Sequence, residues 1–323
     1  MPEMQSYMGV NEGNSGIIGK LLYYSTANIL IPKDRFIELG KAFNLPKVKP
    51  ARESAASAYR YATTALKDRV VNKDAGGTHI YRIYCRDNKQ DTSSVICREL
   101  VKETLDSTTN NYKKLANIVF KRETEEMFYD NTEYDPDIDA AQYCEQALTL
   151  FERFKSCYNS DHVDSVVQLL LEKMQAVKIN IHGNLYFIPN PHLPLLNIFE
   201  DYIEALSKCN LNVGNVSSNS MYVANDEKQR EKMTAEFYMN YKRDIETYEE
   251  RIQHFIDNGC SSAAVINRWL KKIEALKAKK TTYEQVLKRR LDDLDKDFSL
   301  LQMQSQELSL RAVKNQMEMP LAA

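Results

Sequence analysis

Most of the features that mark a membrane, secreted or redox protein are missing from this sequence. No stretch approaches the roughly 18 apolar residues of a membrane span, and residues 1–20 hold no apolar run long enough for a signal-peptide core. The six cysteines are scattered and form no C-x-x-C pair, which disfavours zinc knuckles and dithiol redox motifs. We therefore expect a cytoplasmic protein that does not contact membranes and whose cysteines are reduced and mostly buried.

Nucleotide-binding and catalytic signatures are equally scarce. No G-x-x-x-x-G-K-[ST] or G-x-G-x-x-G pattern occurs, and no histidine belongs to an H-E-x-x-H or serine-elbow motif. A formal net charge of -2 gives no global attraction to nucleic acid, so binding of that kind requires a local patch. The sequence predicts no catalytic residue, cofactor or metal site. An enzyme that assembles its site from distant segments stays open as an alternative.

What is present is a chain of 323 residues with 43% hydrophobic content, enough to bury a real core. Residues 21–225 mix two periodicities. A strand ending at Pro32 precedes helices at residues 33–46 and 50–71, and short β-branched and aromatic runs between residues 78 and 131 predict an antiparallel meander. Further helices, a hairpin and a last strand follow. The predicted fold class is therefore α+β, with an antiparallel or mixed sheet and packed helices.

The stretch KINIHGNLYFIPNPH, residues 178–192, carries two of the five histidines and raises the question of a metal site. Apolar residues alternate on both sides of Gly183-Asn184, which predicts a hairpin with a two-residue turn. The predicted pairs are Ile181 with Tyr186 and Ile179 with Ile188. In that register His182 and His192 do not converge, so we expect a hairpin and no metal ligands.

A second metal-like pattern, DPDIDA, begins at Asp135. Its aspartates occupy the first, third and fifth positions of a calcium loop. The glycine and glutamate that the loop needs at its sixth and twelfth positions are replaced by Ala140 and Gln146. The pattern is better interpreted as the acidic start of a helix.

Residues 226–311 predict a long C-terminal helical hairpin, between a flexible N-terminus at residues 1–20 and a frayed tail at residues 312–323. Apolar positions are spaced three and four apart up to a break at Asn258-Gly259, and the spacing resumes after Ser261 in a coiled-coil-like pattern. The second helix outruns the first, so part of its apolar stripe lacks a partner. The predicted oligomer or partner interface is Leu287, Leu291, Leu294, Phe298 and Leu301.

The same region holds the strongest basic bias of the chain. The basic residues are Arg268, Lys271, Lys272, Lys277, Lys279, Lys280, Lys288, Arg289 and Arg290. They predict nucleic-acid contact through phosphates, together with a basic helix around Lys47, Lys49, Arg52 and Arg60. The alternative is a solvated helix flank that pairs with the acids of the preceding helix: Asp244, Glu246, Glu249 and Glu250.

Four stretches together resemble a family of uncharacterised proteins of bacteria, archaea, phages and mobile elements, defined by a domain of unknown function. They are ILIPKDRFIELGKAFNLP, PARESAASAYRYAT, CRELVKETLDSTTNNYKKLANIVF and AVKINIHGNLYFIPNPHLPLLNIFEDYIEAL, and the resemblance spans residues 22–250. Tyr59-Arg60-Tyr61 departs from the Phe-Arg-Arg that the resemblance leads us to expect. The resemblance implies a role in the conflict or replication biology of such elements, and no activity.

The leading functional prediction is a non-enzymatic interaction or assembly protein of a phage or mobile element. Its helical arm would carry self-association into a homo-oligomer or the binding of a host protein, in the setting of phage-host conflict. The alternatives are a nucleic-acid-binding protein that uses residues 268–290, and an enzyme with a dispersed site.

Overall fold

The computed structural model describes residues 16–45, 54–74, 77–88, 92–105, 111–179, 183–260 and 262–317. The chain forms two compact units. The first takes its described residues from Met1–Ser25, Val167–Glu204 and Ser217–Ala323, and the second from Thr26–Val166 and Ala205–Val216. This division differs from the predicted boundary between residues 225 and 226, because strand β1 (Ile17–Thr26) packs with the C-terminal helices and not with the meander.

The first unit contains a four-stranded sheet in the order β11-β1-β10-β9. Its other strands are β11 (Val216–Ala224), β10 (Leu185–Pro189) and β9 (Val177–Lys178). Strand β1 pairs with β10 in antiparallel fashion. The two strands approach so closely at Gly19 that a Cβ there would lie 2.1 Å from the carbonyl oxygen of Ile188, which only glycine allows.

The inner strands of this sheet are buried on both faces. On one face Tyr186 stacks on Tyr24, which also meets Phe199 of helix α5 (Leu193–Cys209). On the other face Phe187 lies against Tyr283 of helix α7 (Ala263–Leu287). Because adjacent residues of a strand point to opposite faces, β10 carries an unbroken apolar run and not an alternating pattern.

That burial explains why the predicted hairpin register is wrong. Strand β9 pairs with β10 through Lys178↔Tyr186 and Val177↔Phe187. The amide of Ile179 donates to the carbonyl of Leu185, so Ile179 does not face Ile188. The alternation of apolar and polar residues along a strand specifies its pairing register, and a strand that is buried on both faces has no such alternation. The predicted partners Ile181 and His182 lie outside the described residues.

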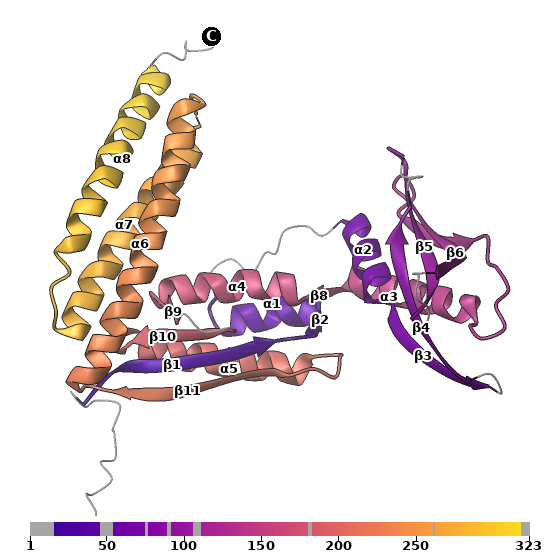
Figure 1. Cartoon of the computed structure of the whole chain (residues 1–323). Coiled ribbons are helices and arrows are strands. Elements are labelled where there is room, and N and C mark those ends of the chain that lie inside the picture. The colour runs from indigo at the N-terminus through magenta and orange to yellow at the C-terminus, as the bar shows by residue number, and fades with distance from the viewer. Residues whose placement is uncertain are drawn as a thin grey trace, which may run out of the picture. The chain divides into compact units, whose positions relative to one another are not determined.

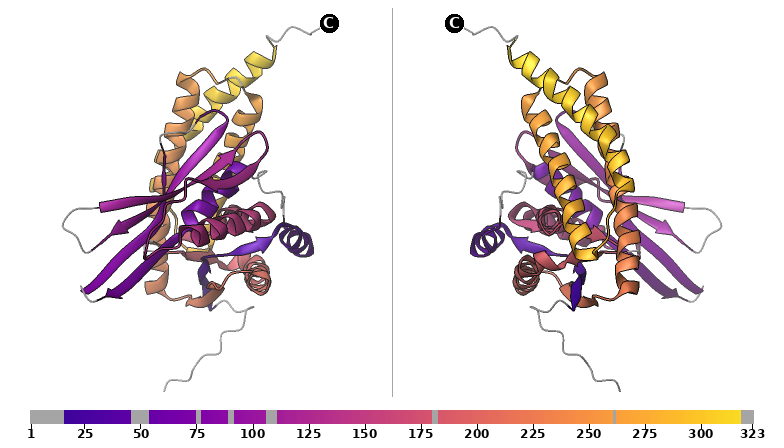
Figure 2. Two further views of the ribbon diagram at one scale, coloured as in Figure 1. Left: turned by 90° about the vertical axis from the view of Figure 1, so that its right-hand side faces the viewer. Right: turned by 90° about the vertical axis from the view of Figure 1, so that its left-hand side faces the viewer.

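Three helices, α6 (Glu227–Asp257), α7 and α8 (Asp293–Met317), lie side by side in the first unit (Figures 1 and 2). The predicted second arm of a helical hairpin is in fact two helices. The chain turns at Lys288, which adopts a left-handed backbone conformation with φ 54. The Glu284 carboxylate supports the turn by accepting a hydrogen bond from the Leu291 amide at 2.9 Å. Neither glycine nor proline marks the break, so the apolar spacing runs across it.

The second unit is built on a five-stranded antiparallel sheet in chain order, which confirms the predicted meander. Its strands are β3 (Lys67–Asp74), β4 (Gly77–Asp87), β5 (Val95–Thr104), β6 (Asn111–Lys121) and β7 (Glu126–Asp130). We predicted the first of these as the end of a helix. The helix α2 (Ala55–Ala65) stops earlier, and the segment that follows pairs with β4 along its whole length.

One face of this sheet is covered by α2 and α3 (Ala140–Ser156) (Figure 1). Tyr59, Phe120 and Phe151 meet in that core. No described helix of the second unit packs on the opposite face, which we call the open face. The remaining elements of the unit are helix α1 (Lys33–Ala42), helix α4 (Ser160–Lys173), which continues into the first unit, and a two-stranded sheet of β2 (Leu30–Pro32) and β8 (Cys157–Asn159).

Candidate functional site

The apolar stripe predicted as an interface is part of the core of the first unit. Leu287, Leu294 and Leu301 are 0% exposed, and Leu291 and Phe298 are 6% and 7% exposed. All five belong to one cluster with the buried residues of α6 and α7. The expectation that these residues lack a partner within the chain is therefore wrong, because the turn at Lys288 returns α8 against α6.

Some of the basic residues predicted to contact nucleic acid form ion pairs within the chain. The Lys280 ammonium is buried and lies 2.7 Å from Asp295 and 3.1 Å from Glu284. Arg289 pairs with Glu227. Six of the nine predicted residues are exposed: Arg268, Lys271, Lys272, Lys277, Lys288 and Arg290. Of the second predicted basic helix, Arg60 is exposed on α2, and Lys47, Lys49 and Arg52 lie outside the described residues.

Lys279 lines a cavity of about 550 Å³ in the first unit. The end of α4, the β9–β10 segment, α6 and α7 form its walls. The Lys279 ammonium lies 3.9 Å from the Asp244 carboxylate there. Asp244 is one of the acidic residues with which the solvated-flank interpretation pairs the basic segment. Glu172, Gln175 and Tyr248 also line the space. The Gln175 Oε1 atom is buried and has no hydrogen-bond partner among the described residues.

Desolvation controls the charges in this cavity. Burial lowers the pKa of Lys279, and the attraction of Asp244 offsets this only in part. Burial likewise raises the pKa of Asp244 against the opposing effect of Lys279. Burial also raises the pKa of Tyr248 to about 12. The cavity is therefore a polar space whose ion pair is incompletely solvated, of a size that suits small polar molecules.

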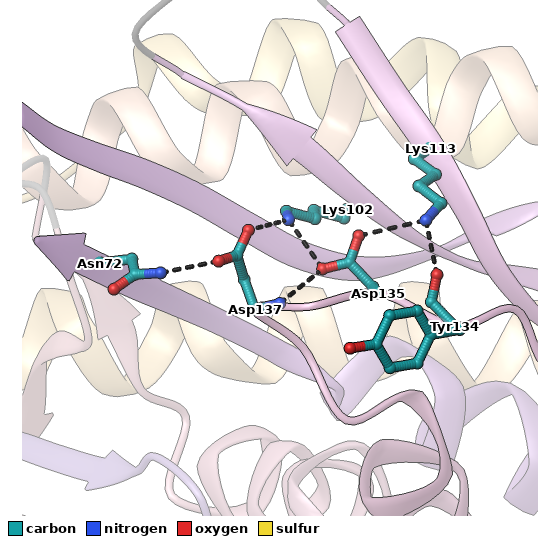
Figure 3. Close-up of polar contacts among 6 residues, drawn as sticks. All are labelled: Asn72, Lys102, Lys113, Tyr134, Asp135 and Asp137. Atoms are coloured by element: carbon teal, nitrogen blue, oxygen red, sulfur yellow. Dashed lines mark hydrogen bonds and ion pairs between the residues drawn. The ribbon is translucent and has the colours of Figure 1, made fainter. Parts of the chain in front are cut away.

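Two aspartates of the calcium-loop-like pattern, Asp135 and Asp137, bind a lysine ammonium (Figure 3). The Lys102 ammonium donates to Asp135 Oδ1 at 2.8 Å and to Asp137 Oδ2 at 2.7 Å. Lys113 reaches the other Asp135 oxygen at 3.3 Å, and Asn72 donates to Asp137 at 2.7 Å. Figure 3 shows both carboxylates turned toward these donors.

The electrostatics of this cluster, Lys102 with Asp135 and Asp137, favour a structural role. Burial of Asp135 raises its pKa, but the Lys102 hydrogen bond and the Asp137 amide outweigh burial, so the pKa is lowered overall. The third aspartate, Asp139, caps α3 by accepting from the Gln142 amide at 3.2 Å, as an acidic helix start predicts. Among the described residues, no group of three His, Cys, Asp or Glu side chains is placed to hold a metal ion.

Burial shifts the pKa values of several histidine and cysteine side chains. His192 is half-buried in a short 3-10 turn, and burial lowers its pKa. Cys97, Cys144 and Cys157 are buried, and Cys85, Cys209 and Cys260 are partly buried. Burial raises the pKa of Cys85 to about 12 and that of Cys144 to about 11, so neither thiol is suited to nucleophilic chemistry.

Sequence reasoning missed the free edge of the first sheet. Strand β11 is an outermost strand, and its nine residues, VSSNSMYVA, include no charged side chain. Met221 and Tyr222 on this strand are 64% and 43% exposed. By contrast, the edge strands β3 and β7 of the other sheet carry Lys, Arg, Asp or Glu. The sequence shows that this segment lacks charged residues, but it does not show that the strand lies at the edge of a sheet.

These features define a mixed α+β protein with separate antiparallel sheets, in which no described helix is long and apolar enough to cross a membrane. The chain belongs to a family of unknown function, DUF6744, whose family model matches residues 17–314. No curated protein and no solved structure matches the chain.

Proposed function

We propose that this protein is a non-enzymatic assembly protein that pairs with a second copy of itself through the free edge of β11. The observation that carries the proposal is the uncharged, nine-residue edge strand. An edge strand presents unpaired N–H and C=O groups, and proteins usually protect such edges with charge, proline or shortness. Strand β11 has none of these protections.

A second copy suits this edge better than an arbitrary strand. A two-fold axis through the edge sets β11 against itself in antiparallel fashion and joins two four-stranded sheets into one. Like charges directly opposite each other destabilise strand pairs, and β11 contributes none to such an interface. Its serines and asparagine are neutral on both copies. Under the same operation, the shorter edge β7 would set Glu126 opposite Asp130 of the second copy.

The rest of the proposal has different support. A cytoplasmic setting draws on the sequence composition. A setting in phage or mobile elements, and a role in conflict with a host, draw on the family resemblance alone. The helical arm no longer contributes an interface to the proposal, because its apolar stripe is buried within the chain.

The test is light scattering on the purified chain at tens of micromolar, with charge placed on the edge. Asn219 and Met221 are both exposed, and N219K/M221K brings four lysines together in the paired state. We expect a dimeric wild type and a monomeric variant with unchanged circular dichroism. The control Q302K/Q306K adds the same charge at exposed positions of α8 and should stay dimeric. A monomeric wild type would contradict the proposal and direct attention to a host protein as the partner.

A further inference from the structure

The open face of the five-stranded sheet alternates basic and aromatic side chains. The strand register places Lys67 beside Tyr84, and Arg69 beside Arg82. Ile83 lies between Arg82 and Tyr84 in sequence and is fully buried in the core under α2 and α3. Because residues of a strand alternate between faces, Arg82 and Tyr84 share the uncovered side.

The positive charge on this face is concentrated on β3 and β4. Lys67, Arg69 and Arg82 are exposed, and they form no ion pair with any residue in the described part of the chain. Asp68, between the first two, turns to the covered face, where its carboxylate accepts from the Tyr143 hydroxyl at 2.6 Å. Arg69 and Arg82 are direct cross-strand partners. Two like charges in that position repel each other. Glu103 of β5, the other cross-strand neighbour of Arg82, offsets part of this repulsion, and a bound anion would relieve it further.

Aromatic rings accompany these charges across the sheet. The Arg82 guanidinium lies 5.1 Å from the ring centre of Tyr84, and Arg86 lies 4.1 Å from that of Tyr112. Tyr112 is 53% exposed. Toward the centre of the face the charge is balanced, because Glu99 binds Arg86 at 2.8 Å and Lys114 at 3.6 Å. The face is therefore basic at its β3–β4 side and aromatic toward its centre.

A shallow hollow lies at the basic side. Its volume is about 450 Å³, and it is lined by Lys67, Asp68, Arg69, Arg82 and Leu105. The hollow gives a polyanion a place to approach several cations at once. Tyr84 pairs with Lys67 on the same face, and Tyr112 lies two strands further along the sheet, paired with Glu103.

We propose that this open face binds single-stranded nucleic acid. Lys67, Arg69 and Arg82 contact the phosphates, and Tyr84 and Tyr112 stack with bases. Positive charge along a backbone path combined with stacking rings is how proteins hold single strands with little sequence preference. Two other polyanions, duplex nucleic acid and an acidic protein, fit the surface less well. The base faces of a duplex are already stacked and an acidic protein has no bases, so neither ligand would stack on Tyr84 and Tyr112. The proposal concerns a different sheet and a different partner from assembly through β11.

The test is fluorescence anisotropy of the full chain with labelled single-stranded DNA and RNA of about 12 nucleotides, which covers one site of this kind. We expect affinity to fall with salt at a slope near -2 in a double-logarithmic plot, from about three phosphate contacts. R69Q/R82Q should weaken binding at least about tenfold at low salt and bring the slope closer to zero by about 1.4. Y112A should weaken binding by about fivefold or more, with its slope unchanged.

The matched control is R35Q/R153Q, which removes two exposed guanidinium groups from α1 and α3 of the same unit. It should bind as the wild type does, and the melting of every variant is compared by circular dichroism. Absence of binding to single strands at low salt overturns the proposal. So do equal losses in R69Q/R82Q and the control. Binding of duplex DNA or heparin as tightly as single strands, with Y112A unaffected, also overturns it, because it would indicate a polyanion surface without stacking.

Discussion

The sheet of the first unit is buried on both faces and ends at an uncharged edge, whereas the sheet of the second unit is covered on one face and ends at charged edges. In the first, Tyr186 and Phe187 meet opposite layers of helices. In the second, Ile83 is buried and the next residue, Tyr84, faces the uncovered side. A sheet with two buried faces has only its edge to offer a partner, and a sheet with protected edges has only its face. The two proposed interactions follow from that difference.

The largest expected effect tests whether the stripe of the C-terminal helices belongs to the core of the first unit. L294E/L301E places two carboxylates at positions that are fully buried. We expect a loss of about 5 kcal/mol or more, comparable with the stability of a whole domain, because unpaired charges are costly to bury. Thermal and urea unfolding monitored by circular dichroism measure it.

Leu300 and Met303 supply the control for that change, since they are 51% and 67% exposed on the same helix. L300E/M303E should change the free energy of unfolding by no more than about 0.5 kcal/mol. A folded, monomeric L294E/L301E would show that the stripe is an interface between chains and not a core.

A smaller effect is expected at the charged cluster of the second unit. K102M removes the ammonium that Asp135 and Asp137 share and leaves Asp135 only the longer contact with Lys113, so it should cost about 3–5 kcal/mol near neutral pH. In the wild type the pKa values of both aspartates are lowered, so their contribution is present above the unfolded pKa of about 3.9 and is lost as the pH falls below it. The penalty of K102M should therefore shrink as the aspartates take up protons below about pH 4. A penalty independent of pH would mean that packing, and not charge, is lost.

The smallest effect concerns the cavity of the first unit. The lowered pKa of Lys279 and the raised pKa of Asp244 both mean that folding disfavours the charged forms, so this pair does not stabilise the fold at neutral pH. We expect D244N/K279M to lie within about 1 kcal/mol of the wild type or to be more stable. K279M alone should be less stable than the double variant, because it leaves Asp244 unpaired. A large loss in the double variant would show that the pair is stabilising.

Local patterns predicted the elements better than their ends and partners. The spacing of Met233, Phe237 and Tyr241 fixed α6, because one face of a long helix must be apolar and that periodicity is written in the chain. The end of α7 at Lys288 was not predictable from periodicity, because the left-handed turn is held by the Glu284 side chain and the leucines keep their spacing across it. Strand β3 was missed because Val70 and Val71 stand among charged residues that fit a helix equally well.

The candidate sites depended on pairings between distant segments. The pattern around Asp135 predicted an acidic helix start, but nothing local pointed to Lys102 as the partner of Asp135. The open face needed the register that sets Arg69 beside Arg82. Charge content is local information, whereas the face or edge that receives the charge is decided by strand order.

The first unit is assembled from three separate stretches of chain, and this has a consequence for synthesis on the ribosome. Strand β1 ends at Thr26, but its neighbour β10 begins at Leu185 and its other neighbour, β11, begins at Val216. At about 5–20 residues per second, β1 emerges many seconds before either partner exists. The meander pairs only with its own sequence neighbours, so it has complete partners much earlier. The nascent chain can therefore complete its meander first, whereas β1 has no partner strand until β10 is synthesised.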